Sequence, residues 1–150
     1  MIIQTVFTFM ATLGFGVLFN IRGKKLVIGA LAGGIAWFAY LMFYKLTHSD
    51  ITSFFLATIL AASYAEIMAR IFKTPVTSFV ICAIIPLVPG GGMYYTVLKV
   101  IRGNITDALS SGIKTIGIAG AIAVGIFFVS MIFKIIGERH TAKDDQIAGA

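Results

Sequence analysis

The stretch AIIPLVPGGGMYYTV at positions 83–97 places two prolines and three glycines inside an apolar run. Each proline removes an amide donor and clashes with the preceding helical turn, so Pro86 and Pro89 together predict a broken helix. In hydrocarbon, irregular backbone survives only where protein buries it or where it lines a wet cavity. A helix resuming near Met93 would point its free amides, the positive end of its dipole, into the break. Transporters use such a break to hold a carboxylate at mid-membrane.

The broken stretch therefore supplies the candidate substrate-binding residues. Its glycines would let a substrate approach the backbone closely, and its tyrosines would offer hydroxyl groups one turn away. The candidates are Pro86, Pro89, Gly90, Gly91, Gly92, Tyr94 and Tyr95. A simpler interpretation stays open, in which the prolines only kink a helix and the glycines only allow close packing.

Glu66 is the one acidic residue within an apolar segment. A charge at the centre of a membrane helix costs on the order of 3 kcal/mol or more, so such acids are usually paired or functional. We consider Glu66 a candidate proton-coupling carboxylate, because burial raises the affinity of a carboxylate for protons. The alternative is an ion pair near the membrane surface with Arg70, four residues further along the helix.

Other reactive residues give no pattern of an enzyme or of a metal site. Cys82 is the single cysteine, and neither His48 nor His140 has metal-ligand spacing to other ligating residues. The triple glycine lacks the Lys-Ser/Thr pair of a phosphate-binding loop, and no nucleophile-base pattern is present. We predict no enzymatic activity, no metal and no cofactor.

Composition places the chain in lipid. Of its 150 residues, 59% are hydrophobic and 12% are charged, against about 25% charged in an ordinary soluble domain. The net charge of +6 comes from single or paired basic residues between apolar runs. Without a basic stripe or arm for phosphates, we predict no nucleic-acid partner.

Five apolar segments are each close to the roughly 20 residues that a helix needs to cross a bilayer. They cover about 2–20, 26–44, 51–69, 76–98 and 114–136, with a polar connection at 99–113. The first lacks the basic start and the cleavage site of a signal peptide, so we take it as a retained helix. The sequence predicts an all-α polytopic membrane domain over 1–136, its fourth helix broken at Pro86–Gly92, and a cytoplasmic tail over 137–150.

The distribution of Lys and Arg predicts the orientation. With five crossings, eight basic residues lie on one side and four on the other, which favours an outside N-terminus and a cytoplasmic C-terminus. One side would hold Arg22, Lys24, Lys25, Arg70, Lys73, Lys134, Arg139 and Lys143, and the other Lys45, Lys99, Arg102 and Lys114. A fourth segment that enters and returns gives the same count. We favour five crossings because 23 residues are enough to span.

Small residues recur at four-residue spacing on three segments, where they let helix backbones approach closely. The stripes are Ala57, Ala61, Ala65 and Ala69; Gly117, Ala121 and Gly125; and Gly29 and Gly33. They predict packing within the bundle, and three such faces also favour a homo-oligomer.

Three stretches resemble the threonine/serine exporter family over about 5–136. They are the Pro-x-x-Pro-Gly-Gly-Gly run with the following Gly103-Asn104, ATLGFGVLFN at 11–20, and SYAEIMARIFKTP at 63–75. More narrowly, the chain is similar to the small subunit, which matches the C-terminal membrane half of the fused exporters.

The resemblance implies a secondary exporter of threonine and serine in the bacterial inner membrane, driven by the proton gradient. It also implies a larger partner subunit that supplies the other half. Some split members are linked to succinate-like dicarboxylates. We favour amino acids, because the broken segment carries no basic side chain before Lys99. A non-transporting scaffold subunit and a homo-oligomeric channel remain alternatives.

Overall fold

The computed structural model describes residues 1–148, and it describes side chains as far as residue 136. Every described element is helical, which confirms the predicted all-α fold. The elements are α1 (Ile2–Leu18), α2 (Lys24–Thr47), α3 (Asp50–Ile71), α4 (Val76–Ile84), the 3-10 turn η1 (Ile85–Leu87), α5 (Gly90–Ile101) and α6 (Ile105–Ala148). The predicted tail at 137–150 lies outside the residues whose side chains are described.

Three helices are long and apolar enough to cross a membrane: α2, α3 and the part of α6 from Ile105 to Ile136. A fourth candidate crossing is the pair made by α4 with η1 and by α5, which are bent by 46° at the break and together are long and apolar enough to span. These spans agree with a polytopic membrane protein. The 17 residues of α1 make about 25 Å of helix, so a crossing by α1 stays a prediction.

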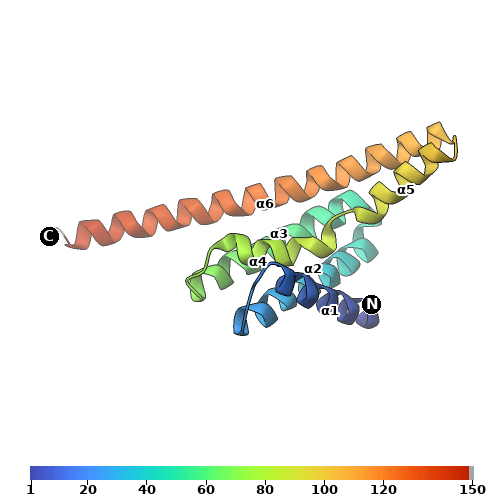
Figure 1. The fold of residues 1–150 in the computed structure, drawn as a ribbon. Coiled ribbons are helices and arrows are strands. Elements are labelled where there is room, and N and C mark those ends of the chain that lie inside the picture. The colour runs from blue at the N-terminus through green and yellow to red at the C-terminus, as the bar shows by residue number, and fades with distance from the viewer. Residues whose placement is uncertain (149–150) are drawn as a thin grey trace.

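The path of the chain favours one broken crossing over a re-entrant loop. A bend of 46° leaves α5 running in broadly the same direction as α4. Figure 1 shows α5 leading away to the far end of the molecule, from which α6 returns along the whole length of the bundle. The fourth segment therefore begins at one end of the bundle and ends at the other.

The predicted polar connection at 99–113 is wrong, because only residues 102–104 lie between α5 and α6. Gly103 has a φ of 77°, the left-handed conformation that commonly ends a helix. The Asn104 Oδ1 then accepts a hydrogen bond of 3.3 Å from the Asp107 amide, which caps the start of α6. Because the end of α5 and the start of α6 both find local hydrogen-bond partners, a short turn joins the two helices. The polar residues that follow Asn104 therefore belong to α6 and not to a loop.

The small-residue stripes pack helices of this chain against one another. All four alanines of the α3 stripe are buried. On α6, a Cβ added to Gly125 would lie 3.0 Å from Thr58 Cγ2 of α3. The main core lies where α2, α3, α4 and α6 meet, around Ala36, Ala61 and Ala83. Packing within the bundle thus accounts for the stripes, and a homo-oligomer stays a prediction.

We expect Asn104→Ala to weaken the start of α6 by about 1 kcal/mol, because alanine cannot accept the capping hydrogen bond. Hydrogen exchange of the amides at 105–108 should become faster. Asn104→Ser, which keeps an oxygen acceptor, is the matched control and should exchange much as the native chain does. Equal exchange in both variants would contradict the cap.

Candidate functional site: a cavity beside the broken helix

Helix α5 begins at Gly90, three residues before the start predicted near Met93. Pro89, with a φ of −77°, occupies the N-cap position of α5. The three glycines form the first helical turn and have no positive φ; among the described glycines only Gly23 and Gly103 do. The irregular backbone of the break is therefore confined to η1, Val88 and Pro89, and the glycines do not serve to allow an unusual conformation.

The first turn of α5 leaves amide groups without acceptors. The Met93 amide donates to Pro89 O at 3.1 Å, and the Gly90 amide donates to Val88 O at 2.7 Å. No side chain caps this helix. Within the described part of the chain, the Gly91 and Gly92 amides have no such partner. The N-terminus of α5 thus offers two amide donors and the positive end of the helix dipole, as predicted for the break.

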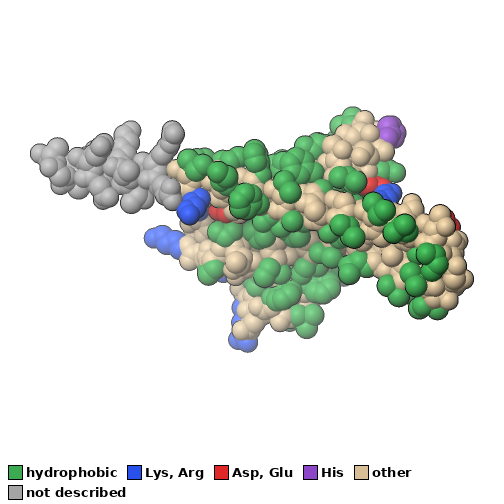
Figure 2. All heavy atoms as spheres, turned by 90° about the horizontal axis from the view of Figure 1, so that it is seen from above, with side chains coloured by type: hydrophobic (Ala, Val, Ile, Leu, Met, Phe, Trp, Pro, Cys, Tyr) green, Lys and Arg blue, Asp and Glu red, His purple; other side chains and the backbone are tan. Residues whose placement is uncertain are grey.

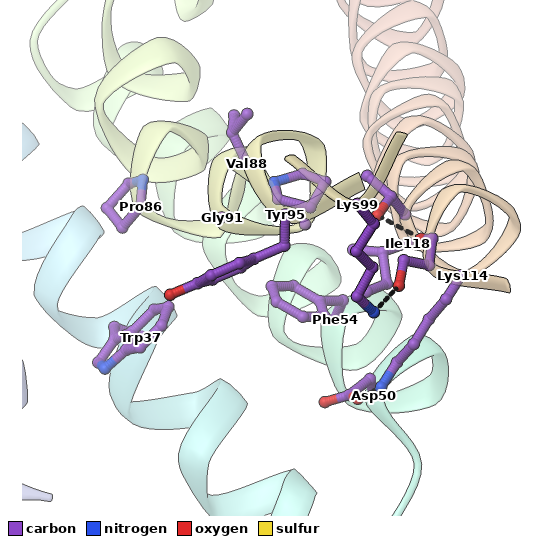
Figure 3. Close-up of a pocket in the computed structure, with 14 residues that line it drawn as sticks. Trp37, Asp50, Phe54, Pro86, Val88, Gly91, Tyr95, Lys99, Lys114 and Ile118 are labelled. Atoms are coloured by element: carbon purple, nitrogen blue, oxygen red, sulfur yellow. Dashed lines mark hydrogen bonds and ion pairs between the residues drawn. The ribbon is translucent and has the colours of Figure 1, made fainter. Parts of the chain in front are cut away.

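A cavity of about 590 Å³ lies beside these amides, between α2, α3, the break and α6. Figure 3 shows Lys99, Lys114 and Asp50 on one side and the aromatic rings of Trp37, Tyr95 and Phe54 on the other. The remaining lining residues are Pro86, Val88, Pro89, Gly91, Gly92, Ser111, Thr115 and Ile118. Trp37 precedes the end of α2 by ten residues, or about 15 Å of helix. The cavity therefore reaches from one end of the bundle toward its middle.

The cavity contains charged groups that sequence reasoning missed. Lys114 of α6 forms an ion pair with Asp50 Oδ2 at the start of α3. Tyr40 of α2 donates a hydrogen bond of 3.0 Å to Asp50 Oδ1. On the same side of the cavity, Lys99 Nζ of α5 donates to Ser111 Oγ at 2.6 Å. The sequence signal was weak, because these residues lie at the ends of predicted segments and resemble ordinary interfacial charges.

Five of the seven predicted site residues line the cavity. They are Pro86, Pro89, Gly91, Gly92 and Tyr95. Gly90 and Tyr94 are not among the lining residues. Tyr94 is exposed, and its ring packs edge-on against that of Tyr95 at a centroid distance of 5.3 Å. The structure thus brings most of the predicted residues together, but only the Tyr95 side of the tyrosine pair faces the cavity.

Glu66 lies outside the cavity and is only 8% exposed. The predicted ion pair with Arg70 is wrong: between Asp/Glu and Lys/Arg side chains described in the structure, only Lys114 and Asp50 form one. Arg70 instead donates to Phe133 O of α6 at 2.7 Å, and its guanidinium lies 5.2 Å from the centre of the Phe133 ring. A carbonyl and an aromatic face on the neighbouring helix together compete with the carboxylate for Arg70.

Gly91 and Gly92 have different surroundings. A Cβ added to Gly92 would lie 2.5 Å from Thr115 Oγ1 of α6, which itself donates to Ser111 O at 2.7 Å. A Cβ added to Gly91 would meet nothing within 4 Å. Gly92 therefore allows α5 and α6 to pack closely, whereas Gly91 borders open space in the cavity.

We expect Gly92→Ala to lower the free energy of unfolding by about 1–3 kcal/mol, because the new methyl group overlaps the Thr115 side chain. Gly91→Ala is the matched control and should be at least as stable as the native chain. Thermal unfolding in detergent measures both. Adding Thr115→Ala to Gly92→Ala should recover most of the loss, and no difference between the two glycine variants would refute the assigned packing role.

Comparison with known proteins identifies the family of the chain. Neither the curated proteins nor the solved structures give a match. The sequence profile of the family described as Threonine/Serine exporter, ThrE matches residues 4–132, which is most of the chain and includes the break and every residue lining the cavity. The chain therefore belongs to the threonine/serine exporter family, ThrE.

Proposed function

We propose that the chain is one membrane half of a secondary exporter and that its cavity binds the carboxylate of a small substrate, threonine or serine. The observation that carries this proposal is that two amides without acceptors and a lysine ammonium group belong to the lining of one cavity. Amide and ammonium donors together bind carboxylates through charge-assisted hydrogen bonds. The family to which the chain belongs supports export as the activity.

The charge of the cavity supports an anionic group as ligand. Two lysines and one aspartate line it, which gives a formal charge of +1. Because Lys114 is paired with Asp50, the unbalanced positive charge lies on Lys99, whose ammonium group bonds to a neutral hydroxyl. Both the lysine and the Gly91 and Gly92 amides favour an anionic ligand in this cavity.

A dicarboxylate is the second candidate, and one observation favours it. The preference for amino acids depended on the lack of a basic side chain near the break. Lys99 and Lys114 both line the cavity that contains the break, so a second carboxylate has a possible partner. Succinate-like substrates therefore belong in every transport test.

We also propose that a larger subunit covers the α5–α6 hairpin. No residue of α5 is buried, and Figure 1 shows this hairpin projecting beyond the other helices. Apolar side chains exposed on it include Val97, Ile101, Ile105 and Leu109. Helices of a second membrane subunit would bury these side chains and complete the cavity wall.

The distribution of basic residues supports the proposed orientation in the bacterial inner membrane. Figure 2 shows most visible Lys and Arg side chains near the end opposite the α5–α6 turn. Arg22 and Lys25 of the α1–α2 region border a pocket with Thr74 and Ser78 of the α3–α4 region, so two loops with basic residues meet there. The positive-inside rule places this end in the cytoplasm.

Efflux from proteoliposomes loaded with labelled threonine or succinate tests the function. The vesicles contain this chain alone or with a candidate large subunit, with and without an imposed proton gradient. We expect gradient-dependent efflux only from the pair. Efflux by the single chain that does not depend on the gradient would identify a channel. Absence of efflux from every combination would favour a scaffold subunit.

We expect Gly91→Leu to raise the KM for efflux at least tenfold, because its side chain would fill space beside the free amides. Leucine is a good helix former, so thermal unfolding should change little. Leucine at Gly14, where an added Cβ also meets nothing within 4 Å, is the matched control outside the cavity. Unchanged efflux in Gly91→Leu would contradict substrate binding at the break.

Glu66 is the proposed proton-coupling group, because it is buried and has no hydrogen-bond partner among the described residues. An acidic side chain within a membrane span is usually paired or functional. We expect Glu66→Gln to abolish the dependence of efflux on the proton gradient while the variant still binds substrate. Transport with unchanged pH dependence in Glu66→Gln would end this role.

A further inference from the structure

We propose that Asp50 binds the ammonium group of an amino-acid substrate and thereby selects zwitterions over other carboxylates. On binding, Lys114 leaves Asp50 and pairs with the substrate carboxylate. This inference rests on the proposed function only in taking the cavity as the substrate site. It assigns Asp50 as the specificity-determining residue.

The Asp50 carboxylate is held in a fixed position. Tyr40 hydrogen-bonds one of its oxygens and Lys114 pairs with the other. The Tyr40 ring stacks on Phe54 at a centroid distance of 4.3 Å and packs against Trp37 at 5.2 Å. Asp50 is thus anchored to an aromatic wall of the cavity, and its side chain is only 19% exposed. Aromatic faces also favour a nearby ammonium group.

Lys114 is the mobile member of the ion pair. Its side chain is 60% exposed, and a lysine ammonium is a point charge on a flexible stem. Removing the cation from a partly buried carboxylate is costly unless another cation replaces it. The ammonium group of a substrate is such a replacement, so entry of a zwitterion allows Lys114 to move.

The charges balance for an amino acid. A zwitterion brings one cation for Asp50 and one anion for Lys99, Lys114 and the Gly91 and Gly92 amides, so each new charge gains a partner. A monocarboxylate without an ammonium group leaves the Asp50–Lys114 pair intact and has only Lys99 and the amides. A dicarboxylate brings a second anion close to Asp50, where it is repelled. Replacing Asp50 by a neutral residue would remove this repulsion and free Lys114.

The test is binding of three ligands to the full chain in lipid nanodiscs, alone and with the candidate large subunit, by calorimetry. The ligands are threonine, succinate, and 3-hydroxybutyrate, which is threonine without its amino group. In the native protein we expect threonine to bind at least tenfold more tightly than 3-hydroxybutyrate. In Asp50→Asn this ratio should fall to about one, and succinate should bind more tightly. Asp107→Asn, whose carboxylate lies outside the cavity lining, should leave all three affinities unchanged.

If Asp50→Asn still binds threonine much more tightly than 3-hydroxybutyrate, the proposal is overturned. If Gly91→Leu abolishes threonine binding in the same experiment, the cavity remains the substrate site and only the role of Asp50 fails. Absence of binding by the native protein in every arrangement would instead contradict the proposed function.

A second variant covers the case in which Asp50→Asn does not fold. Lys114→Gln keeps Asp50 and removes its resident cation, so the preference for threonine over 3-hydroxybutyrate should be kept or increased. Loss of that preference in Lys114→Gln would contradict recognition of the ammonium group by Asp50.

Discussion

The interruption of the fourth crossing is the constraint on which the cavity depends. Pro86 and Pro89 prevent a continuous helix, and backbone groups freed inside a membrane need partners from protein or water. The chain meets most of this need locally, through the 3-10 turn η1 and the bond from the Gly90 amide to Val88 O. Among the amide donors at the break, those of Gly91 and Gly92 remain without an acceptor in the described part of the chain. Because these amides lie beside the cavity, the break that leaves them without acceptors also provides hydrogen-bond donors for an anion.

Close packing around the break fixes where the charges lie. Gly92 brings α5 against Thr115 of α6, and this contact places Lys99 beside Ser111. On the opposite side, α3 packs on α6 through small residues, which brings Asp50 to Lys114. Three charged side chains from three helices are thereby gathered at one cavity, although no two of them are neighbours in the sequence.

The fold could largely be predicted from the sequence, because apolar length and proline chemistry act locally. The break that begins near Pro86 and the buried stripe that includes Ala61 follow from those local rules, whereas Gly90, Gly91 and Gly92 belong to helix α5 and not to the break. The start of α6 was missed, because polar residues at 105–113 resemble a loop until the caps at Gly103 and Asn104 are recognised.

The site was harder to predict, since its charges come from three helices. Asp50 and Lys114 are 64 positions apart, and nothing in their local sequence indicates an ion pair. Arg70 shows the converse error: the i+4 spacing predicted a partner in Glu66, but Phe133 of another helix provides a better one. Helix-surface rules consider one helix at a time, whereas these pairings are decided by the packing of several helices.

The two acids considered for function lie at opposite ends of α3. Positions 50 and 66 are 16 residues apart, or about 24 Å along the helix. A substrate at Asp50 and a proton at Glu66 therefore cannot interact by direct contact, and their coupling would have to pass through the packed groups between them. Both ends of α3 are tied to α6, by Lys114 at one and by the contact of Arg70 with Phe133 at the other. Between them the interface combines small residues such as Gly125 with buried larger side chains such as Phe54 and Ile122. If Lys114 moved from Asp50 to a substrate, one of these two contacts between α3 and α6 would be lost. The α3–α6 interface is therefore the physical route by which an effect of binding in the cavity could reach Glu66.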